Sequence, residues 1–139
     1  MAISQNTVSN TIYVCTPKIA AAVGSALAQT FWGPAPVACT VTAIDFIQGT
    51  QGSSTAGLNL FKDTATQAPG GGTSLLVGGT ALVSSAIANN TLTACSLNAA
   101  AAGLAVAAGD RLSFLLTGTL TALENAEFRV TLNTTTVAS

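Results

Sequence analysis

The strongest regularity in the sequence is an alternation of apolar and polar residues over 37–47. Alternate side chains of an extended chain point to opposite faces, so this spacing predicts a long strand. Its two faces are expected to carry Val37, Cys39, Val41 and Ala43 on one side and Ala38, Thr40, Thr42, Ile44 and Phe46 on the other. Asp45 falls on the Val41 face near the end of the strand, where we expect that face to reach solvent or a partner.

Shorter runs of β-branched, aromatic and aliphatic residues predict further strands, separated by turn residues. These runs cover residues 9–15, 58–62, 74–77, 81–87, 91–97, 111–116 and 127–132. In the last run, Phe128, Val130 and Leu132 are expected to point inward. Residues 18–28 fit either a short helix or an extended segment, and we favour the extended form because Gly24 weakens a helix.

The spacing of these strands predicts the fold class. About eight strands with turns at intervals of roughly ten residues, and no long amphipathic helix, indicate an all-β fold. We expect an antiparallel β-sandwich that is jelly-roll-like, with an Ig-like topology as the alternative. A length of 139 residues suits one domain. Residues 1–10 are expected to form an extended N-terminal arm, and residues 11–139 the sandwich.

The N-terminal arm is the first candidate for binding a partner. It has too few large apolar residues to fold alone, so we expect it to become ordered against another protein. Ile3 and Val8 are its candidate anchors. Residues 7–13 are β-prone and can add a strand to a neighbouring sheet, which adds Ile12 and Tyr13 to the candidate partner-binding residues.

Composition adds that the surface is poor in charge. Charged residues make up 6% of the chain, against about a quarter in typical globular proteins. The surface is therefore expected to consist mainly of small polar residues and alanine, which lose less on leaving water than charged groups do. Such a surface favours interfaces, so we expect a homo-oligomer, with a neutral soluble monomer as the alternative.

The same composition argues against several other partners. Four basic residues and a net charge of -1 provide no patch that could neutralise a run of phosphates, so we expect no nucleic acid. No apolar run reaches the roughly 18 residues needed to span a bilayer, so we expect no membrane. The first residues lack the basic and apolar regions of a signal peptide, and synthesis in the cytoplasm is expected.

Residues suited to catalysis or metal binding are scarce. The chain has no histidine, the commonest general base and metal ligand. Glu124 and Glu127 fit a polar turn before a strand better than an acid–base pair. Asp110, beside Arg111, fits a turn in which the carboxylate accepts backbone donors better than a calcium site. We therefore expect no enzymatic activity, no cofactor and no metal site.

Two other features that often carry chemistry have simpler interpretations here. The glycines at 70–72 lack the lysine and the following helix of a phosphate-binding loop, and they indicate a flexible surface loop. Cys15, Cys39 and Cys95 are odd in number and far apart, which argues against a disulfide framework or a metal cluster. We expect buried free thiols that stay reduced.

The arm and four segments together resemble small bacteriophage capsid decoration, or cement, proteins. The four segments are residues 41–47, 58–62, 108–114 and 128–132. The resemblance implies a jelly-roll module, commonly trimeric, that sits outside a mature capsid where major capsid proteins meet and reinforces it against internal pressure. It brings no catalytic residues. On this basis we expect a structural virion protein whose partners are the major capsid protein and further copies of itself.

A receptor- or glycan-binding module of a phage fibre or bacterial adhesin is the alternative. Such modules use similar sandwiches rich in threonine and glycine. Trp32, beside Phe31 and two prolines, would then serve as a sugar-stacking platform; it fits a partner anchor or a core residue as well. A receptor binder needs an exposed crown of aromatic and charged groups, which are few here, so we favour the capsid role.

Overall fold

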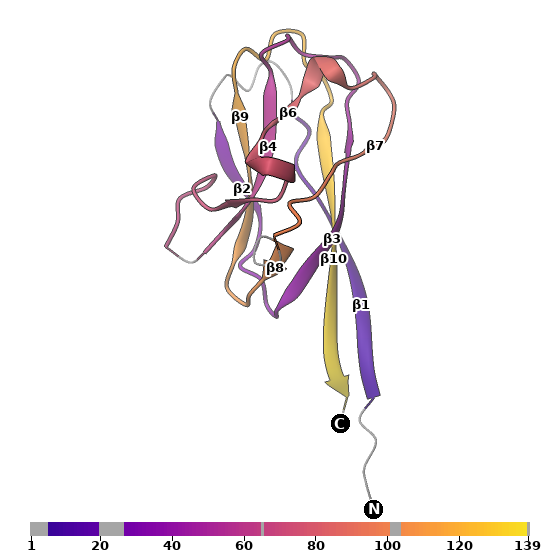
Figure 1. Cartoon of the computed structure of the whole chain (residues 1–139), viewed down its shortest axis with the longest axis vertical. Coiled ribbons are helices and arrows are strands. Elements are labelled where there is room, and N and C mark those ends of the chain that lie inside the picture. Colours follow the sequence, from indigo (N-terminus) through magenta and orange to yellow (C-terminus); the bar gives the residue numbers. More distant parts are fainter. Residues whose placement is uncertain (1–5, 20–26, 65, 101–103, 139) are drawn as a thin grey trace, which may run out of the picture.

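The computed structural model of the chain is an antiparallel β-sandwich, and it describes residues 6–19, 27–64, 66–100 and 104–138 (Figure 1). One sheet has the order β1-β10-β3-β7, with β8 also paired to β3, and the other has the order β2-β9-β4-β5, with β6 also paired to β4. The strands are β1 (Asn6–Cys15), β2 (Ala28–Trp32), β3 (Cys39–Ile47), β4 (Gly57–Asp63), β5 (Thr73–Ser74), β6 (Leu82–Val83), β7 (Thr93–Ala94), β8 (Ala105–Val106), β9 (Arg111–Thr117) and β10 (Glu127–Ala138). The predicted all-β sandwich is confirmed.

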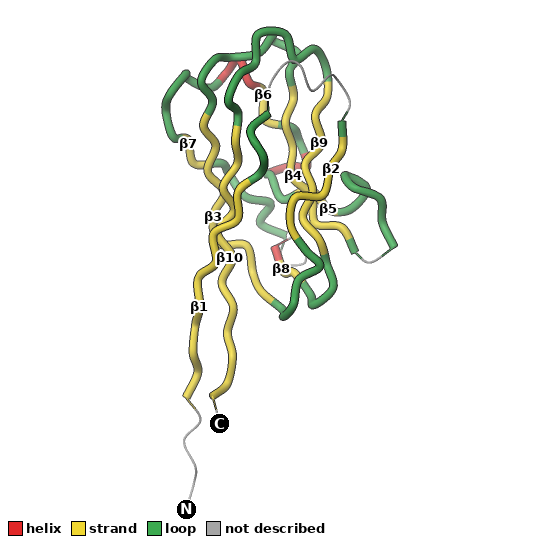
Figure 2. The backbone as a smooth tube through the Cα atoms, turned by 180° about the vertical axis from the view of Figure 1, so that it is seen from behind, coloured by secondary structure: helices red, strands yellow, loops and turns green. Residues whose placement is uncertain are grey.

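The first and last strands continue beyond the sandwich as a two-stranded ribbon, which carries both termini toward its tip (Figures 1 and 2). Their antiparallel register runs from Asn6 opposite Ala138 to Cys15 opposite Arg129. Pairing of β3 with β10 ends at Asn133, so the last part of β10 is paired only with β1 in the described chain. The part of the expected arm that is described, residues 6–10, lies in this ribbon.

A β-bulge interrupts β3 where it pairs with β10. Val41 lies opposite Leu132 and Ala43 lies opposite Thr131, which leaves Thr42 without a position of its own in the register. An extra residue of this kind bends the strand and shifts the phase of its side chains by one residue.

The bulge corrects the predicted faces of residues 37–47. Val41 is buried before the bulge, whereas Ile44 and Phe46 are buried after it, so these residues share the inward face. Asp45 therefore lies on the outer face rather than beside Val41. A strict period of two fails here because it assumes an unbroken ladder.

The core fills the space between the sheets with aliphatic side chains and two phenylalanines whose rings are in tilted contact. The ring centroids of Phe46 and Phe128 are 4.8 Å apart. The inward positions predicted for Phe128, Val130 and Leu132 are confirmed, since all three are fully buried. Burial of each such side chain contributes about 2 kcal/mol, so these alternating positions fix which face of β10 turns inward.

The chain between residues 73 and 97 contains shorter strands than the sequence predicts. Residues 74–77, 81–87 and 91–97 hold two-residue strands together with two 3-10 turns, η2 (Val77–Gly79) and η3 (Ser84–Ala86). Short apolar runs do not distinguish a strand from a turn whose side chains pack inward. Most of the ambiguous segment 18–28, residues 20–26, lies outside the described residues.

Candidate partner-binding surface

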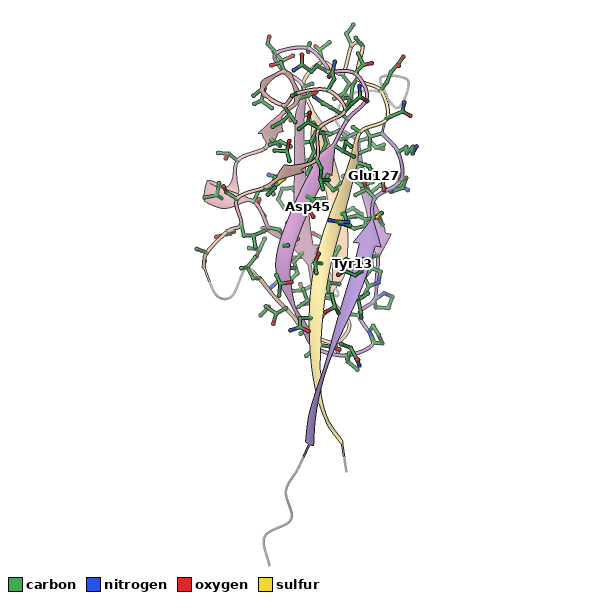
Figure 3. The ribbon with its side chains drawn as sticks, turned by 90° about the vertical axis from the view of Figure 1, so that its right-hand side faces the viewer. Tyr13, Asp45 and Glu127 are labelled. Carbon is green, nitrogen blue, oxygen red and sulfur yellow. The ribbon has the colours of Figure 1, made fainter. Side chains whose placement is uncertain are left out.

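Exposed aromatic, aliphatic and charged side chains gather on the outer face of the sheet formed by β1, β10, β3 and β7. Figure 3 shows Tyr13, Asp45 and Glu127 on three strands of this sheet. We call this surface the outer patch, and it consists of Tyr13, Cys15, Asp45, Ile47, Leu92, Glu127 and Arg129. Tyr13 is 65% exposed and Leu92 is 57% exposed, although residues of this size are usually covered in a sandwich.

An arginine joins the strands of the outer patch. The Arg129 guanidinium donates a hydrogen bond to Asp45 Oδ2 at 2.7 Å, which also makes it an ion pair. The Arg129 Cζ atom lies 5.7 Å from the centre of the Tyr13 ring, within the range of a cation–π contact. The hydrogen bond and the charge of Asp45 raise the pKa of Arg129. The patch therefore presents a fixed cation beside an aromatic ring.

An open hollow of about 240 Å³ lies next to this arginine. It is lined by Cys15, Asp45, Ile47, Leu92, Glu127 and Arg129. The pKa of the Cys15 thiol is raised, mainly because the thiol loses part of its hydration. A hydrogen bond with Glu127 and the negative charge of that residue raise the pKa further. A protonated thiol is a poor nucleophile, so the hollow is suited to contact rather than to covalent chemistry.

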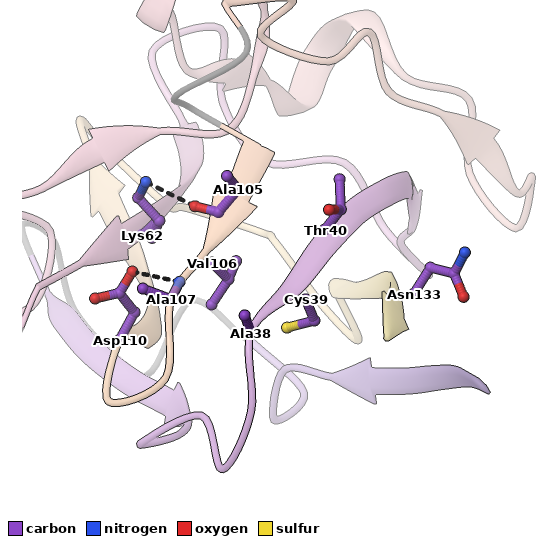
Figure 4. A pocket seen from close by; sticks show the side chains of 9 residues that line it. All are labelled: Ala38, Cys39, Thr40, Lys62, Ala105, Val106, Ala107, Asp110 and Asn133. Atoms are coloured by element: carbon purple, nitrogen blue, oxygen red, sulfur yellow. Dashed lines mark hydrogen bonds between the residues drawn. The ribbon is translucent and has the colours of Figure 1, made fainter. Parts of the chain in front are cut away.

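A larger open cleft, of about 630 Å³, lies where the ribbon leaves the sandwich (Figure 4). Its lining residues are Ala38, Cys39, Thr40, Lys62, Ala105, Val106, Ala107, Asp110 and Asn133. Asp110 Oδ2 accepts a hydrogen bond from the Ala107 N–H at 2.9 Å, and Lys62 Nζ donates one to the Ala105 carbonyl at 2.8 Å. The predicted role of Asp110 as an acceptor for backbone donors in a turn is confirmed.

The polar groups of this cleft mainly hold backbone. Burial, and then the charge of Asp110, raise the pKa of the Cys39 thiol, so that thiol also stays protonated at neutral pH.

Within the described ranges, no group of three or more cysteine or acidic side chains is arranged to hold a metal ion. No helix in the described part of the chain is long and apolar enough to span a bilayer.

The three cysteines are all free thiols, but their environments differ from the prediction. Cys39 is buried, Cys95 is partly exposed and Cys15 is exposed. The expectation of buried thiols is therefore wrong for Cys15, because it lies on the outer face of the edge strand β1.

The predicted partner-binding residues do not form one cluster in the part of the chain that the structure describes. Ile3 lies outside the described residues, and Val8 is placed by its backbone register opposite Thr136. Ile12 is partly buried against the core, while its neighbour Tyr13 is exposed on the outer face. Trp32 belongs to the other sheet, where it ends β2 and packs partly against the core.

The other members of the outer patch were not among the predicted partner-binding residues, although Asp45 was expected to reach solvent or a partner. Ile47 and Arg129 lie on strands that are far apart in the sequence, and the register between β3 and β10 brings them to one surface. The available signal was the presence of Asp45 and Arg129, two of only nine charged residues, in predicted strands. Their pairing depends on the register between β3 and β10, which the alternation within one strand does not show.

Comparison with known proteins gives a likeness to a solved structure. No protein-family model and no curated protein sequence matches the chain. Among solved structures, a chain of the structure described as the cyanophage Pam1 capsid asymmetric unit is similar, with a TM-score of 0.44 and 14% sequence identity. The alignment covers 96% of this chain and 86% of that chain.

Proposed function

We propose that this chain is a non-enzymatic decoration protein that binds the outer surface of a phage capsid as a homotrimer and stabilises it. The observation that carries the proposal is the ribbon, which extends from the sandwich as a strand pair without a covering layer (Figure 2). Residues 6–14 and 130–138, which make up most of it, include no charged residue. A surface of this kind loses little on leaving water and suits a protein interface.

The rest of the surface supports the same role. The outer patch offers a tyrosine and an arginine, two residue types that often dominate the energy of protein interfaces. The polar side chains of the hollow and of the larger cleft mainly form hydrogen bonds to the backbone, and two of them form an ion pair. The partner proposed for these surfaces is the major capsid protein, and the protein would be located on the virion after synthesis in the host cytoplasm.

The proposal is tested by imaging phage particles purified with and without this chain. We expect added density on the outside of decorated particles and an earlier loss of genome on heating when the chain is absent. Deletion of residues 2–10 should leave a folded sandwich but abolish attachment. Attachment of the intact protein should depend little on salt, because few charges take part.

A matched pair of lysine substitutions separates the ribbon from the surface in general. Thr11→Lys places a charge on the exposed ribbon, whereas Val77→Lys places one on η2, where Val77 is 52% exposed. We expect Thr11→Lys to lower particle occupancy at least tenfold and Val77→Lys to leave it unchanged. Full occupancy by the 2–10 deletion, or specific glycan binding without particle binding, would contradict the proposal.

A further inference from the structure

The backbone hydrogen bonds of the ribbon can be assigned to one side or the other. The Thr16 N–H donates to the Phe128 carbonyl at 2.9 Å, just beyond the pair Cys15 and Arg129. Antiparallel ladders alternate between pairs that exchange hydrogen bonds and pairs that do not. Even-numbered residues of β1 therefore bond to β10, while the backbone groups of Thr11 and Tyr13, and by the same period those of residues 7 and 9, point away from it.

A second contact supports this phase. Thr131, the register partner of Tyr13, accepts a hydrogen bond on its backbone oxygen from Thr42 Oγ1 at 3.3 Å, so its carbonyl faces β3 and not β1. The same alternation directs the backbone groups of Thr135 and Val137 away from β1. No strand of the described chain lies beside β10 at these two residues.

The ribbon thus has two open edges, and nothing in its sequence blocks them. An isolated pair of strands is only marginally stable in water. Proteins usually protect exposed edges with charged residues or proline, and residues 6–14 and 130–138 contain neither. Both edges are therefore suited to pairing with another strand.

We propose that the occupant is a second copy of this chain, with the β1 edge of one ribbon paired to the β10 edge of the next. Rotation about an axis parallel to the ribbons brings β1 of one copy beside β10 of its neighbour. Because β1 and β10 run in opposite directions, the new pairing is antiparallel. This inference rests on the self-association included in the proposed function, and it identifies the strands that form it.

Ring closure explains why both edges are open. A twofold pairing of β1 with β1 would satisfy one edge of the ribbon and leave the outer edge of residues 134–138 of β10 open. A ring of ribbons satisfies both edges and closes into an up-and-down barrel, the arrangement that removes sheet edges altogether. It also places every sandwich at the same end, with the tips of the ribbons together at the other.

Proline substitution at an outward-facing amide tests this pairing. Thr11→Pro removes an N–H that points away from β10, so the fold within one copy is expected to persist, since edge strands tolerate proline at such positions. Pairing with a neighbouring copy then lacks that hydrogen bond, and the proline ring collides with the strand of the neighbouring copy. By sedimentation we expect the intact protein and the control Thr11→Val to be trimers at micromolar concentration, and Thr11→Pro to be at least tenfold weaker in self-association.

Amide hydrogen exchange on the intact protein gives a second readout that does not depend on a variant folding. The Ile12 amide faces β10 and should be protected in any state with an intact ribbon. We expect the Thr11 amide to be protected to a similar degree, which requires a partner on the open edge. A Thr11 amide that exchanges as fast as an open strand, or an intact protein that sediments as a monomer, would overturn the inference.

The two proposals fail in different ways. Trimers that depend on Thr11 but never attach to particles would support the pairing and overturn the capsid role. Attachment to particles by a Thr11→Pro protein that is still fully trimeric would support the capsid role and overturn the pairing of the ribbon edges.

Discussion

Gln48, which follows β3, and Ser84, the first residue of η3, form two hydrogen bonds with each other in the interior of the protein. The Ser84 hydroxyl donates to Gln48 Oε1 at 2.6 Å, and Gln48 Nε2 donates to the Ser84 carbonyl at 3.0 Å. Both residues are fully buried. Gln48 Nε2 also reaches the Ile87 carbonyl at 2.7 Å, and Ser84 Oγ accepts the Gly52 N–H at 2.8 Å. The Gln48 amide and the Ser84 hydroxyl therefore hold the end of β3, the loop at Gly52 and the segment 84–87 together.

Removal of that amide should destabilise the fold. Gln48→Leu removes three hydrogen bonds in the interior, to the Ser84 carbonyl, the Ile87 carbonyl and the Ser84 hydroxyl, and we expect the free energy of unfolding to fall by about 3 kcal/mol. Gln51→Leu is the matched control, because Gln51 Nε2 also donates to the Ile87 carbonyl, at 2.6 Å, but from a partly exposed position. Its cost should stay below about 1 kcal/mol. Urea denaturation measures both, and equal losses would show that the buried amide has no special role.

The glycines at 70–72 are not equivalent, although the sequence suggests one flexible run. A Cβ atom on Gly72 would collide with the Lys62 carbonyl, whereas one on Gly71 would lie 3.0 Å from the Ala68 carbonyl. The Gly72 N–H also donates to Asp63 Oδ1 at 2.9 Å, and Asp63 is fully buried. The loop is thus fixed to a buried carboxylate at its end.

Alanine substitutions separate these two positions. We expect Gly72→Ala to lower the free energy of unfolding by about 3 kcal/mol, because the backbone must shift to relieve the collision. Gly71→Ala should cost about 1 kcal/mol or less, since its neighbour need move only slightly. Thermal and chemical unfolding of the two variants provides the comparison. Similar stabilities would mean that the close approach to Lys62 does not constrain the loop.

Local pattern was sufficient for much of the fold and insufficient for the surface. The strands β4, β9 and the first half of β10 were predicted nearly to their ends, because apolar alternation and turn residues are local signals. The bulge at Thr42 was not predictable, since it depends on how β3 registers against β10. The outer patch was not predicted for the same reason, because Asp45 and Arg129 come together only through that register.

The Cys95 thiol should make stability depend on pH in the alkaline range. Burial first, and then the charge of Asp45, raise the pKa of Cys95 from 9.0 to about 11. The folded protein therefore holds this proton more tightly than the unfolded chain does, and the contribution is complete below pH 9.0 and lost as the pH rises toward about 11. Because the thiol is only partly buried, we expect a loss of about 1 kcal/mol.

The variant Cys95→Ala isolates this effect from other groups that titrate at high pH. Urea midpoints of the intact protein and the variant should converge as the pH is raised from 8 to 11. A constant difference between the two proteins across this range would show that the thiol has the same pKa in the folded and unfolded states.

Tyr13 and Trp32, both predicted to bind a partner, should give opposite results on substitution. Tyr13 is 65% exposed beside Arg129, so Tyr13→Ala removes contact area from the outer patch but little from the core. We expect the free energy of unfolding to change by less than about 0.5 kcal/mol, while affinity for particles falls at least tenfold, as for aromatic residues at the centre of an interface.

Trp32 packs partly against the core, and Trp32→Ala should cost about 3 kcal/mol of stability while the folded fraction still attaches. Titration of particles lacking this chain, with unfolding measured in parallel, distinguishes the two. Loss of attachment by Trp32→Ala at a temperature where it is folded, with normal attachment by Tyr13→Ala, would move the partner-binding surface to the other sheet.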